Sequence, residues 1–275
     1  MIPSFLLALR EGVEAALVIG ILLGALRKLG RSNLSGSVWL GAVSAAVVSI
    51  AAALGLRLAG AELEGTAEQV FEGVMLLVAA ALLTWMIFWM HHQARFLKSK
   101  IEKDVRQAVN QDGGRKALFG IAFFAVVREG IELAIFLVAA GLTSNPLQSL
   151  FGALTGIAAA AFLGWALFYT TRRLSLRYFF QITNVLLILF AAGLIGHGIH
   201  EFNEAGLIPP VVEHVYNLAP VIDEDGPLGL ILSALFGYNA NPSLTEVIAY
   251  VSYFVVLVFA LVRFQYEAAV QTVEH

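Results

Sequence analysis

The sequence predicts an all-α membrane protein with seven transmembrane helices, and three observations support this fold class. Of the 275 residues, 59% are hydrophobic and only 13% are charged, whereas soluble domains are usually about 25% charged. The mean hydropathy is +0.80. Seven segments also reach the length of about 20 mostly apolar residues that a bilayer requires. The sequence is therefore interpreted as a single transmembrane domain over residues 1–275.

The predicted spans follow one another closely except at two places. They cover residues 3–26, 36–58, 68–90, 117–142, 147–170, 178–200 and 244–264. Pro3 suits the first turn of a helix, and with no basic residue before the first apolar run we expect a retained span rather than a signal peptide. A polar stretch over residues 91–116 separates the third and fourth spans. An acidic outer loop over residues 201–243, with five of the seven prolines, precedes the seventh helix at 244–265.

The basic residues predict the orientation of these spans. Fourteen of the 17 Lys and Arg residues fall in connections that would all lie on one side of the membrane. Because cytoplasmic connections are enriched in Lys and Arg, we expect the N-terminus outside and the C-terminus in the cytoplasm. The opposite connections are acidic, and this charge would concentrate cations at the outer mouth.

One charged pentapeptide occurs twice inside the apolar runs. It reads Arg10-Glu11-Gly12-Val13-Glu14 in the first span and Arg128-Glu129-Gly130-Ile131-Glu132 in the fourth. A charge at the centre of a membrane helix costs about 2.5 to 3.5 kcal/mol on insertion scales, so such residues are usually functional. The copies are 118 residues apart and lie in spans of opposite direction. This predicts a 3+3 inverted-topology repeat, residues 1–92 and 117–201, whose substrate site lies near the midplane.

The two copies predict a central metal site. Two Glu residues three positions apart share a helix face, and carboxylate oxygens suit hard cations. The four carboxylates are Glu11, Glu14, Glu129 and Glu132, and we expect Arg10 and Arg128 to pair with them. If all six groups are ionised the site carries a charge of −2, which leaves a deficit for a cation to fill. Two alternatives remain open: buried ion pairs that only fix helix packing, and a proton relay without metal.

Further His and Glu residues gather at the outer ends of two spans. They are Glu68 and Glu72 at the start of the third span, and His197, His200 and Glu201 at the end of the sixth. Their mixed ligand set would suit a transition metal, so they form a candidate outer site. The alternatives are carboxylates that complement a helix N-terminus and ordinary polar residues at a membrane interface.

The motif Arg-Glu-Gly-x-Glu in the first and fourth of seven spans resembles the high-affinity ferric iron permease family, the oxidase-dependent iron transporters of fungi and their bacterial relatives. The resemblance covers essentially the whole chain. It implies that the motif Glu residues take part in iron permeation. Fungal members carry an outer Asp-Ala-Ser-Glu motif that is absent here, and Asp223, Glu224 and Asp225 correspond to it only loosely. The resemblance also implies a separate multicopper oxidase, or a periplasmic iron-binding or oxidising protein, as partner.

We therefore expect an iron uptake permease of the bacterial inner membrane that carries iron, in its ferric form, as substrate. The sequence lacks His-Glu-x-x-His, Gly-x-Ser-x-Gly and any phosphate-binding loop, so we expect no enzyme activity, organic cofactor or nucleic-acid partner. Membrane lipid is the other expected partner. A carrier of another divalent cation, a proton-coupled carrier and a non-transporting scaffold subunit of an oxidase complex remain alternatives. The segments Gly20-x-x-x-Gly24 and Gly152-x-x-x-Gly156 offer close-packing faces for use within the bundle or in a homo-oligomer.

Overall fold

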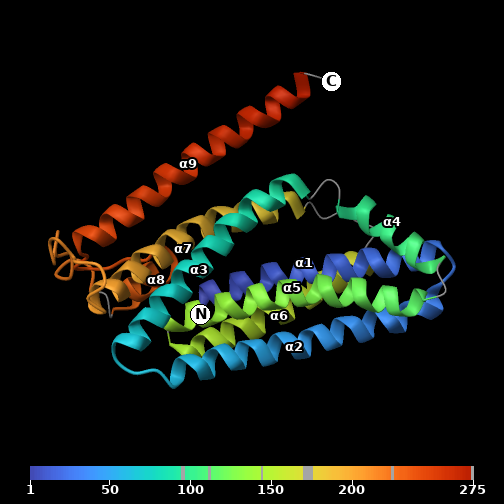
Figure 1. The fold of residues 1–275 in the computed structure, drawn as a ribbon, viewed down its shortest axis with the longest axis horizontal. Coiled ribbons are helices and arrows are strands. Elements are labelled where there is room, and N and C mark those ends of the chain that lie inside the picture. Colours follow the sequence, from blue (N-terminus) through green and yellow to red (C-terminus); the bar gives the residue numbers. More distant parts are fainter. Residues whose placement is uncertain (94–96, 111–112, 144, 170–175, 224–225, 274–275) are drawn as a thin grey trace. The chain divides into compact units, whose positions relative to one another are not determined.

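The computed structural model describes residues 1–93, 97–110, 113–143, 145–169, 176–223 and 226–273, and every regular element in these ranges is a helix (Figure 1). The helices that match the seven predicted spans are α1 (Ile2–Lys28), α2 (Ser35–Ala61), α3 (Thr66–Gln93), α5 (Gly114–Leu142), α6 (Pro146–Tyr169), α7 (Leu176–Glu204) and α9 (Leu244–Val273). The remaining helices are the short 3-10 helix η1 (Ser32–Leu34), α4 (Leu97–Val109) and α8 (Pro227–Phe236).

Five of the long helices, α2, α3, α6, α7 and α9, are apolar enough to cross a membrane. The helices α1 and α5 have the length but contain the charged pentapeptides, which interrupt their apolar character. The protein is therefore an integral membrane protein, while the count of seven spans stays a prediction.

Helices α4 and α8 lie inside segments that the sequence analysis treated as connections. Helix α8 begins at Pro227, which suits a first helical position because its missing N–H needs no partner there. It ends at Gly237, whose φ of +66° lies in the left-handed region that favours glycine. A Cβ on Gly237 would lie 2.1 Å from the Cα of Gly193 in α7, so these two glycines let the end of α8 touch the α7 backbone.

The chain divides into two compact units. Unit 1 contains residues 1–63 and 81–187, and unit 2 contains residues 64–80 and 188–275. The first two helices of both predicted repeats, α1 with α2 and α5 with α6, lie in unit 1.

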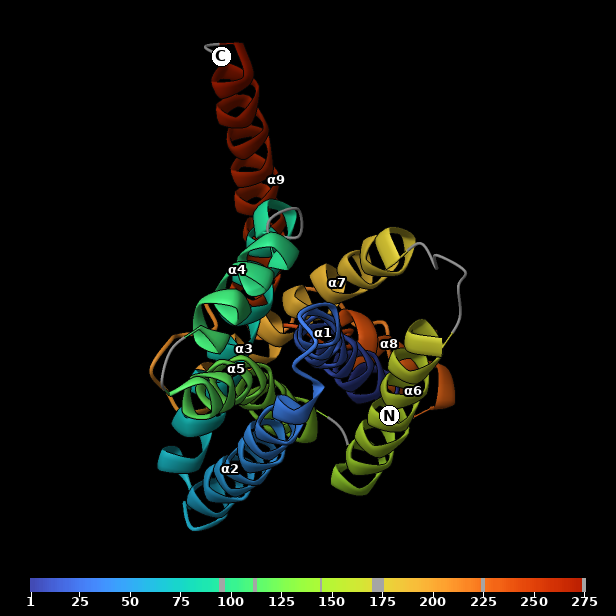
Figure 2. The same ribbon diagram turned by 90° about the vertical axis from the view of Figure 1, so that its right-hand side faces the viewer.

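Two tightly packed helix pairs form the centre of unit 1. Helix α1 packs along α6, and α2 packs along α5; the view in Figure 2 shows α2 and α5 side by side. Contacts in the first pair advance along both helices, from Gly152 beside Phe5 to Gly164 beside Ala16. In the second pair the contacts advance from Gly41 beside Phe119 to Ser49 beside Gly130. The partners in each pair therefore run parallel. The Gly152-x-x-x-Gly156 face is thus used within the chain.

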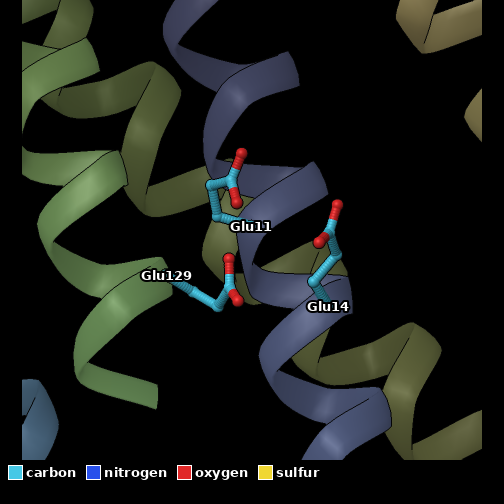
Figure 3. Close-up of side chains that lie close together, drawn as sticks. All are labelled: Glu11, Glu14 and Glu129. Carbon is cyan, nitrogen blue, oxygen red and sulfur yellow. The ribbon is translucent and has the colours of Figure 1, made fainter. Parts of the chain in front are cut away.

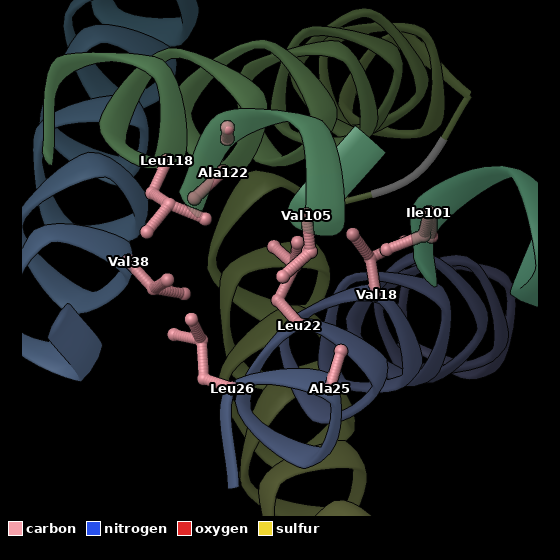
Figure 4. Close-up of a cluster of buried hydrophobic side chains, with 10 residues drawn as sticks. Val18, Leu22, Ala25, Leu26, Val38, Ile101, Val105, Leu118 and Ala122 are labelled. Atoms are coloured by element: carbon pink, nitrogen blue, oxygen red, sulfur yellow. The ribbon is translucent and has the colours of Figure 1, made fainter. Parts of the chain in front are cut away.

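Helix α4 covers one end of unit 1. Its apolar side chains pack on the C-terminal half of α1 and the first turns of α2 and α5 (Figure 4). Val105 of α4 belongs to one buried apolar cluster with Leu22, Val38 and Leu118. The polar stretch between the third and fourth predicted spans thus contains an amphipathic helix, α4, whose apolar side is buried in protein.

Candidate metal centre

The first pentapeptide is buried in α1. The Arg10 side chain is 0% exposed and that of Glu11 is 1% exposed. The Nη1 atom of Arg10 donates a hydrogen bond to Oε1 of Glu11 (3.2 Å) and one to Sδ of Met86 in α3. The Nη2 atom lies 3.3 Å from Oε1 of Glu14, close enough for an ion pair although the angle is poor for a hydrogen bond. One guanidinium therefore partly neutralises two carboxylates one turn apart.

The second pentapeptide in α5 is less enclosed. The Nε atom of Arg128 donates to Oε1 of Glu132 over 3.0 Å, and these side chains are 39% and 15% exposed. Glu129 by contrast is buried. The two copies of one sequence thus have different surroundings: in α5 the arginine pairs with the last Glu of the motif, and the first Glu faces the interior.

Three carboxylates from the two copies meet between α1 and α5. Figure 3 shows the Glu129 side chain reaching from α5 toward α1, where Glu11 and Glu14 lie one turn apart. One oxygen from each of the three lies within 4.8 Å of the other two, and this is the only such group of three His, Asp or Glu in the described part of the chain. Buried Oε atoms of all three have no hydrogen-bond partner, namely Oε2 of Glu11, Oε1 of Glu14 and Oε2 of Glu129.

Buried polar atoms in native proteins nearly always have a partner. Oε2 of Glu11 and Oε2 of Glu129 have no such partner, and Oε1 of Glu14 has only its ion pair with Arg10, so the cluster has acceptor oxygens available for a positive ligand. Hard oxygen donors at this separation are the ligand set of a hard cation such as iron, magnesium or calcium.

The motif glycines set the distances around this cluster. A Cβ on Gly12 would lie 2.6 Å from the Cβ of Ala160 in α6. A Cβ on Gly130 would lie 2.1 Å from Oγ and 2.6 Å from Cβ of Ser49 in α2. Each motif glycine thus lets its helix touch the second helix of the other predicted repeat, which holds α1 and α5 where their carboxylates meet.

The structure brings together three of the four predicted motif carboxylates. Glu132 pairs with Arg128 and interacts electrostatically with Glu14 and Glu129 across the cluster, without joining the group of three. Met86, Ser49 and Ala160, which contact the motifs, were not recognised from sequence. Nothing in their residue type marks them, and their roles follow only from which helices pack together.

The predicted outer residues lie in unit 2, where His200 is the centre of a polar cluster. Its Nδ1 lies 3.1 Å from Oε1 of Glu246 in α9, and its Nε2 lies 3.3 Å from Oε1 of Glu204. Gln69 of α3 donates to the other oxygen of Glu204 (3.2 Å). Glu246 is buried and also accepts from Asn239 (2.9 Å). The sequence analysis counted Glu204 and Glu246 only as outer acidic residues and did not assign them to this cluster.

The other predicted outer groups surround this cluster less closely. Glu72 and Glu201 interact electrostatically with each other and with Glu68, whereas Nδ1 of His197 lies 3.0 Å from the carbonyl oxygen of Gly193. No three of these outer groups approach as closely as the carboxylates of the central cluster, and an outer metal site stays a prediction. Of the predicted acidic loop motif, Asp223 is exposed, and Glu224 and Asp225 lie outside the described residues.

Fold and site together define a class of protein: a helical membrane protein in which two copies of one motif build a carboxylate cluster. The chain belongs to the iron permease FTR1 family, which matches residues 1–273. This confirms the resemblance that the motifs indicated.

The similar proteins are permeases rather than enzymes, as the sequence predicted. A ferrous iron permease EfeU of Yersinia pestis is 34% identical over 265 residues, which are 96% of this chain and 93% of the relative. A ferrous iron permease EfeU of Escherichia coli O6:K15:H31 is 34% identical over the same length, covering 95% of the relative. No solved structure matches the chain.

Proposed function

We propose that the protein moves iron inward across the bacterial inner membrane through a site formed by Glu11, Glu14 and Glu129, with Glu132 beside it. The observation that carries this proposal is the meeting of the buried carboxylates of Glu11 and Glu129 with the partly buried carboxylate of Glu14, each with an Oε atom that has no hydrogen-bond partner. Membership of an iron permease family and relatives named iron permeases support iron as the cargo.

The charge of the site suits a cation of high charge. Four carboxylates and two guanidiniums leave −2 if all are ionised, and Arg10 and Arg128 already share part of the negative charge. Hard carboxylate oxygens favour the ferric ion, so we propose that iron occupies the site in its ferric form. The relatives are named for ferrous iron, which is compatible if a separate multicopper oxidase or periplasmic oxidising protein converts ferrous iron to ferric before permeation.

The proposed path uses seven spans, with α1 and α5 added to the five apolar helices, and a 3+3 inverted repeat. The parallel pairs α1 with α6 and α2 with α5 support the repeat, because an inverted pair of units exchanges corresponding helices in this way. With the N-terminus outside, the cluster around His200 would lie at the outer face and act as a loading site. An inside-negative potential favours inward movement by about 2.3 kcal/mol per charge per 100 mV.

Uptake of radioactive iron into cells or proteoliposomes tests this proposal. Glu14→Gln and Glu129→Gln remove charge with little change of shape, and each is expected to abolish uptake at normal protein levels. The matched control is Glu62→Gln, because Glu62 is an exposed carboxylate in the same unit. Normal uptake by both motif variants would overturn the proposed site. Uptake of manganese or zinc at the rate of iron would favour a general divalent carrier.

The oxidation state needs a separate comparison. Proteoliposomes are given iron either as a ferrous salt prepared without oxygen or as a soluble ferric chelate, and purified oxidase together with air is added to half of the samples. The proposal predicts uptake from ferric iron, and from ferrous iron only when oxidase and oxygen are present. Rapid uptake of ferrous iron without oxidase would contradict the ferric form.

A further inference from the structure

A hollow of about 250 Å³ lies between the first turns of α2 and α5, on the surface of unit 1. It is lined by Ser37 and Leu40 of α2 and by Arg115, Lys116 and Phe119 of α5. On α2, Leu40 follows Ser37 by three positions, and on α5, Phe119 follows the adjacent residues Arg115 and Lys116 by four and three positions, so each pair at this spacing lies on one side of its helix. The residues between them, Val38 and Leu118, point the other way into the buried cluster with α4 (Figure 4).

The hollow combines an apolar lining with uncompensated positive charge. Leu40 is 64% exposed and Trp39 beside it is 53% exposed. Arg115 and Lys116 are exposed, and neither forms an ion pair with any residue that the structure describes. Lys28 at the same end of the unit differs, since it lies 3.1 Å from Glu102.

The backbone adds to this positive potential. Because α2 and α5 run parallel, their N-terminal ends lie at the same end of the pair, and each carries the positive end of a helix dipole. Neither helix has a side-chain cap; the first N–H of α2, that of Ser35, bonds instead to the carbonyl oxygen of Ser32 in η1. Two basic side chains, a hydroxyl and two helix N-termini thus surround an apolar recess.

We propose that this hollow binds an anionic glycerophospholipid, with the phosphate between Arg115 and Lys116 and an acyl chain over Leu40 and Phe119. Charge complementarity selects the anionic headgroup, since basic pockets between membrane helices commonly hold such headgroups. The apolar lining selects a lipid over a free phosphate ion, which would gain nothing from Leu40. The exposed apolar residues Val43 and Val47 continue along α2 from the hollow and give the acyl chain a surface to follow. This site is independent of the proposed iron path.

Native mass spectrometry of the full-length protein, delipidated in detergent and titrated with phosphatidylglycerol, tests the proposal. Each basic residue near a membrane surface is worth about a fivefold change in affinity for anionic lipid, so the double variant Arg115→Gln/Lys116→Gln is expected to bind the first lipid about 30-fold more weakly. The control is Lys100→Gln/Lys103→Gln on α4, which removes the same charge from exposed positions outside the hollow. We expect the control to change affinity less than about threefold.

Two further arms identify the ligand. Leu40→Asn alters only the apolar lining and leaves Arg115 and Lys116 in place. It is nevertheless expected to weaken phosphatidylglycerol binding. Phosphatidylcholine and inorganic phosphate are expected not to displace bound phosphatidylglycerol at equal concentration. Equal weakening by the hollow and control variants would overturn the site in favour of diffuse surface charge. Displacement of phosphatidylglycerol by inorganic phosphate, or unchanged binding by Leu40→Asn, would overturn the proposal that the ligand is a lipid.

Discussion

Gly130→Ala tests whether the contact between α5 and α2 sets the geometry of the proposed metal site. The added Cβ would lie 2.1 Å from Oγ and 2.6 Å from Cβ of Ser49, whereas Cβ contacts below 3.0 Å are essentially never seen. Restoring 3.0 Å requires a displacement of about 0.9 Å with the Ser49 hydroxyl in its present hydrogen bond to Ala45. If the hydroxyl rotates away, the Cβ contact still requires about 0.4 Å. Glu129 precedes Gly130 and moves with the helix.

The expected consequences follow from that displacement. Overpacking of a core typically costs about 1 to 3 kcal/mol of stability, and a misplacement near 1 Å can cost about 100-fold in a process that depends on exact positioning. We therefore expect Gly130→Ala to lower iron uptake about 10- to 100-fold and to lower the thermal unfolding midpoint in detergent. The matched control is Gly120→Ala in the same helix, because a Cβ on Gly120 meets nothing within 4 Å.

A second substitution at Ser49 separates this account from a general defect. Ser49→Gly removes both clashing atoms and is expected to restore uptake in the Gly130→Ala background. Ser49→Ala removes only Oγ, leaves the 2.6 Å contact and is expected to restore uptake partly. Normal uptake by Gly130→Ala alone, or failure of Ser49→Gly to restore it, would refute the reasoning.

Three further predictions use the same protein in detergent. Arg10→Gln should destabilise by about 3 to 5 kcal/mol because it leaves buried carboxylates unpaired, whereas Arg128→Gln should cost about 1 kcal/mol or less since Arg128 is 39% exposed; equal shifts in unfolding midpoint would contradict this. Saturating ferric iron at about 100 times its dissociation constant should stabilise the wild type by about 2.7 kcal/mol and should not stabilise Glu14→Gln. Glu246→Ala removes the acceptor at Nδ1 of His200 near the start of α9. It should weaken the backbone hydrogen bonds of Leu244 to Val212 and of Val215 to Pro242 and so speed proteolysis within residues 205–223, and an unchanged cleavage rate would contradict this prediction.

The sequence predicted the long helices and the motif positions because both depend on local composition. A run of about 20 apolar residues has few other stable forms in a membrane, so six predicted spans match a helix within about four residues at each end, whereas α9 continues to Val273, well beyond the predicted end at residue 264. Helix α4 was treated as a connection because its charged residues hide its apolar face, and α8 because it is short. Their existence depends on neighbours, such as the buried contacts of Val105 and the approach of Gly237 to Gly193.

The carboxylate cluster shows the same limit at the level of side chains. The repeat and the three-residue spacing predicted that all four motif carboxylates would meet, and Glu11, Glu14 and Glu129 do so in the structure. Whether Glu132 joins them depends on the crossing of α1 and α5 and on its pairing with Arg128, neither of which has a local signal. The contact of Arg10 with Met86 joins residues 76 positions apart, and only the tertiary structure reveals it.

The central claim is that iron binds between the two pentapeptides. Diffraction data collected at the iron absorption edge from crystals grown with ferric iron test it most directly. The account predicts an anomalous peak bounded by the carboxylates of Glu11, Glu14 and Glu129, and its loss in Glu129→Gln. Iron bound elsewhere in the protein, with this position empty at saturating iron, would contradict it.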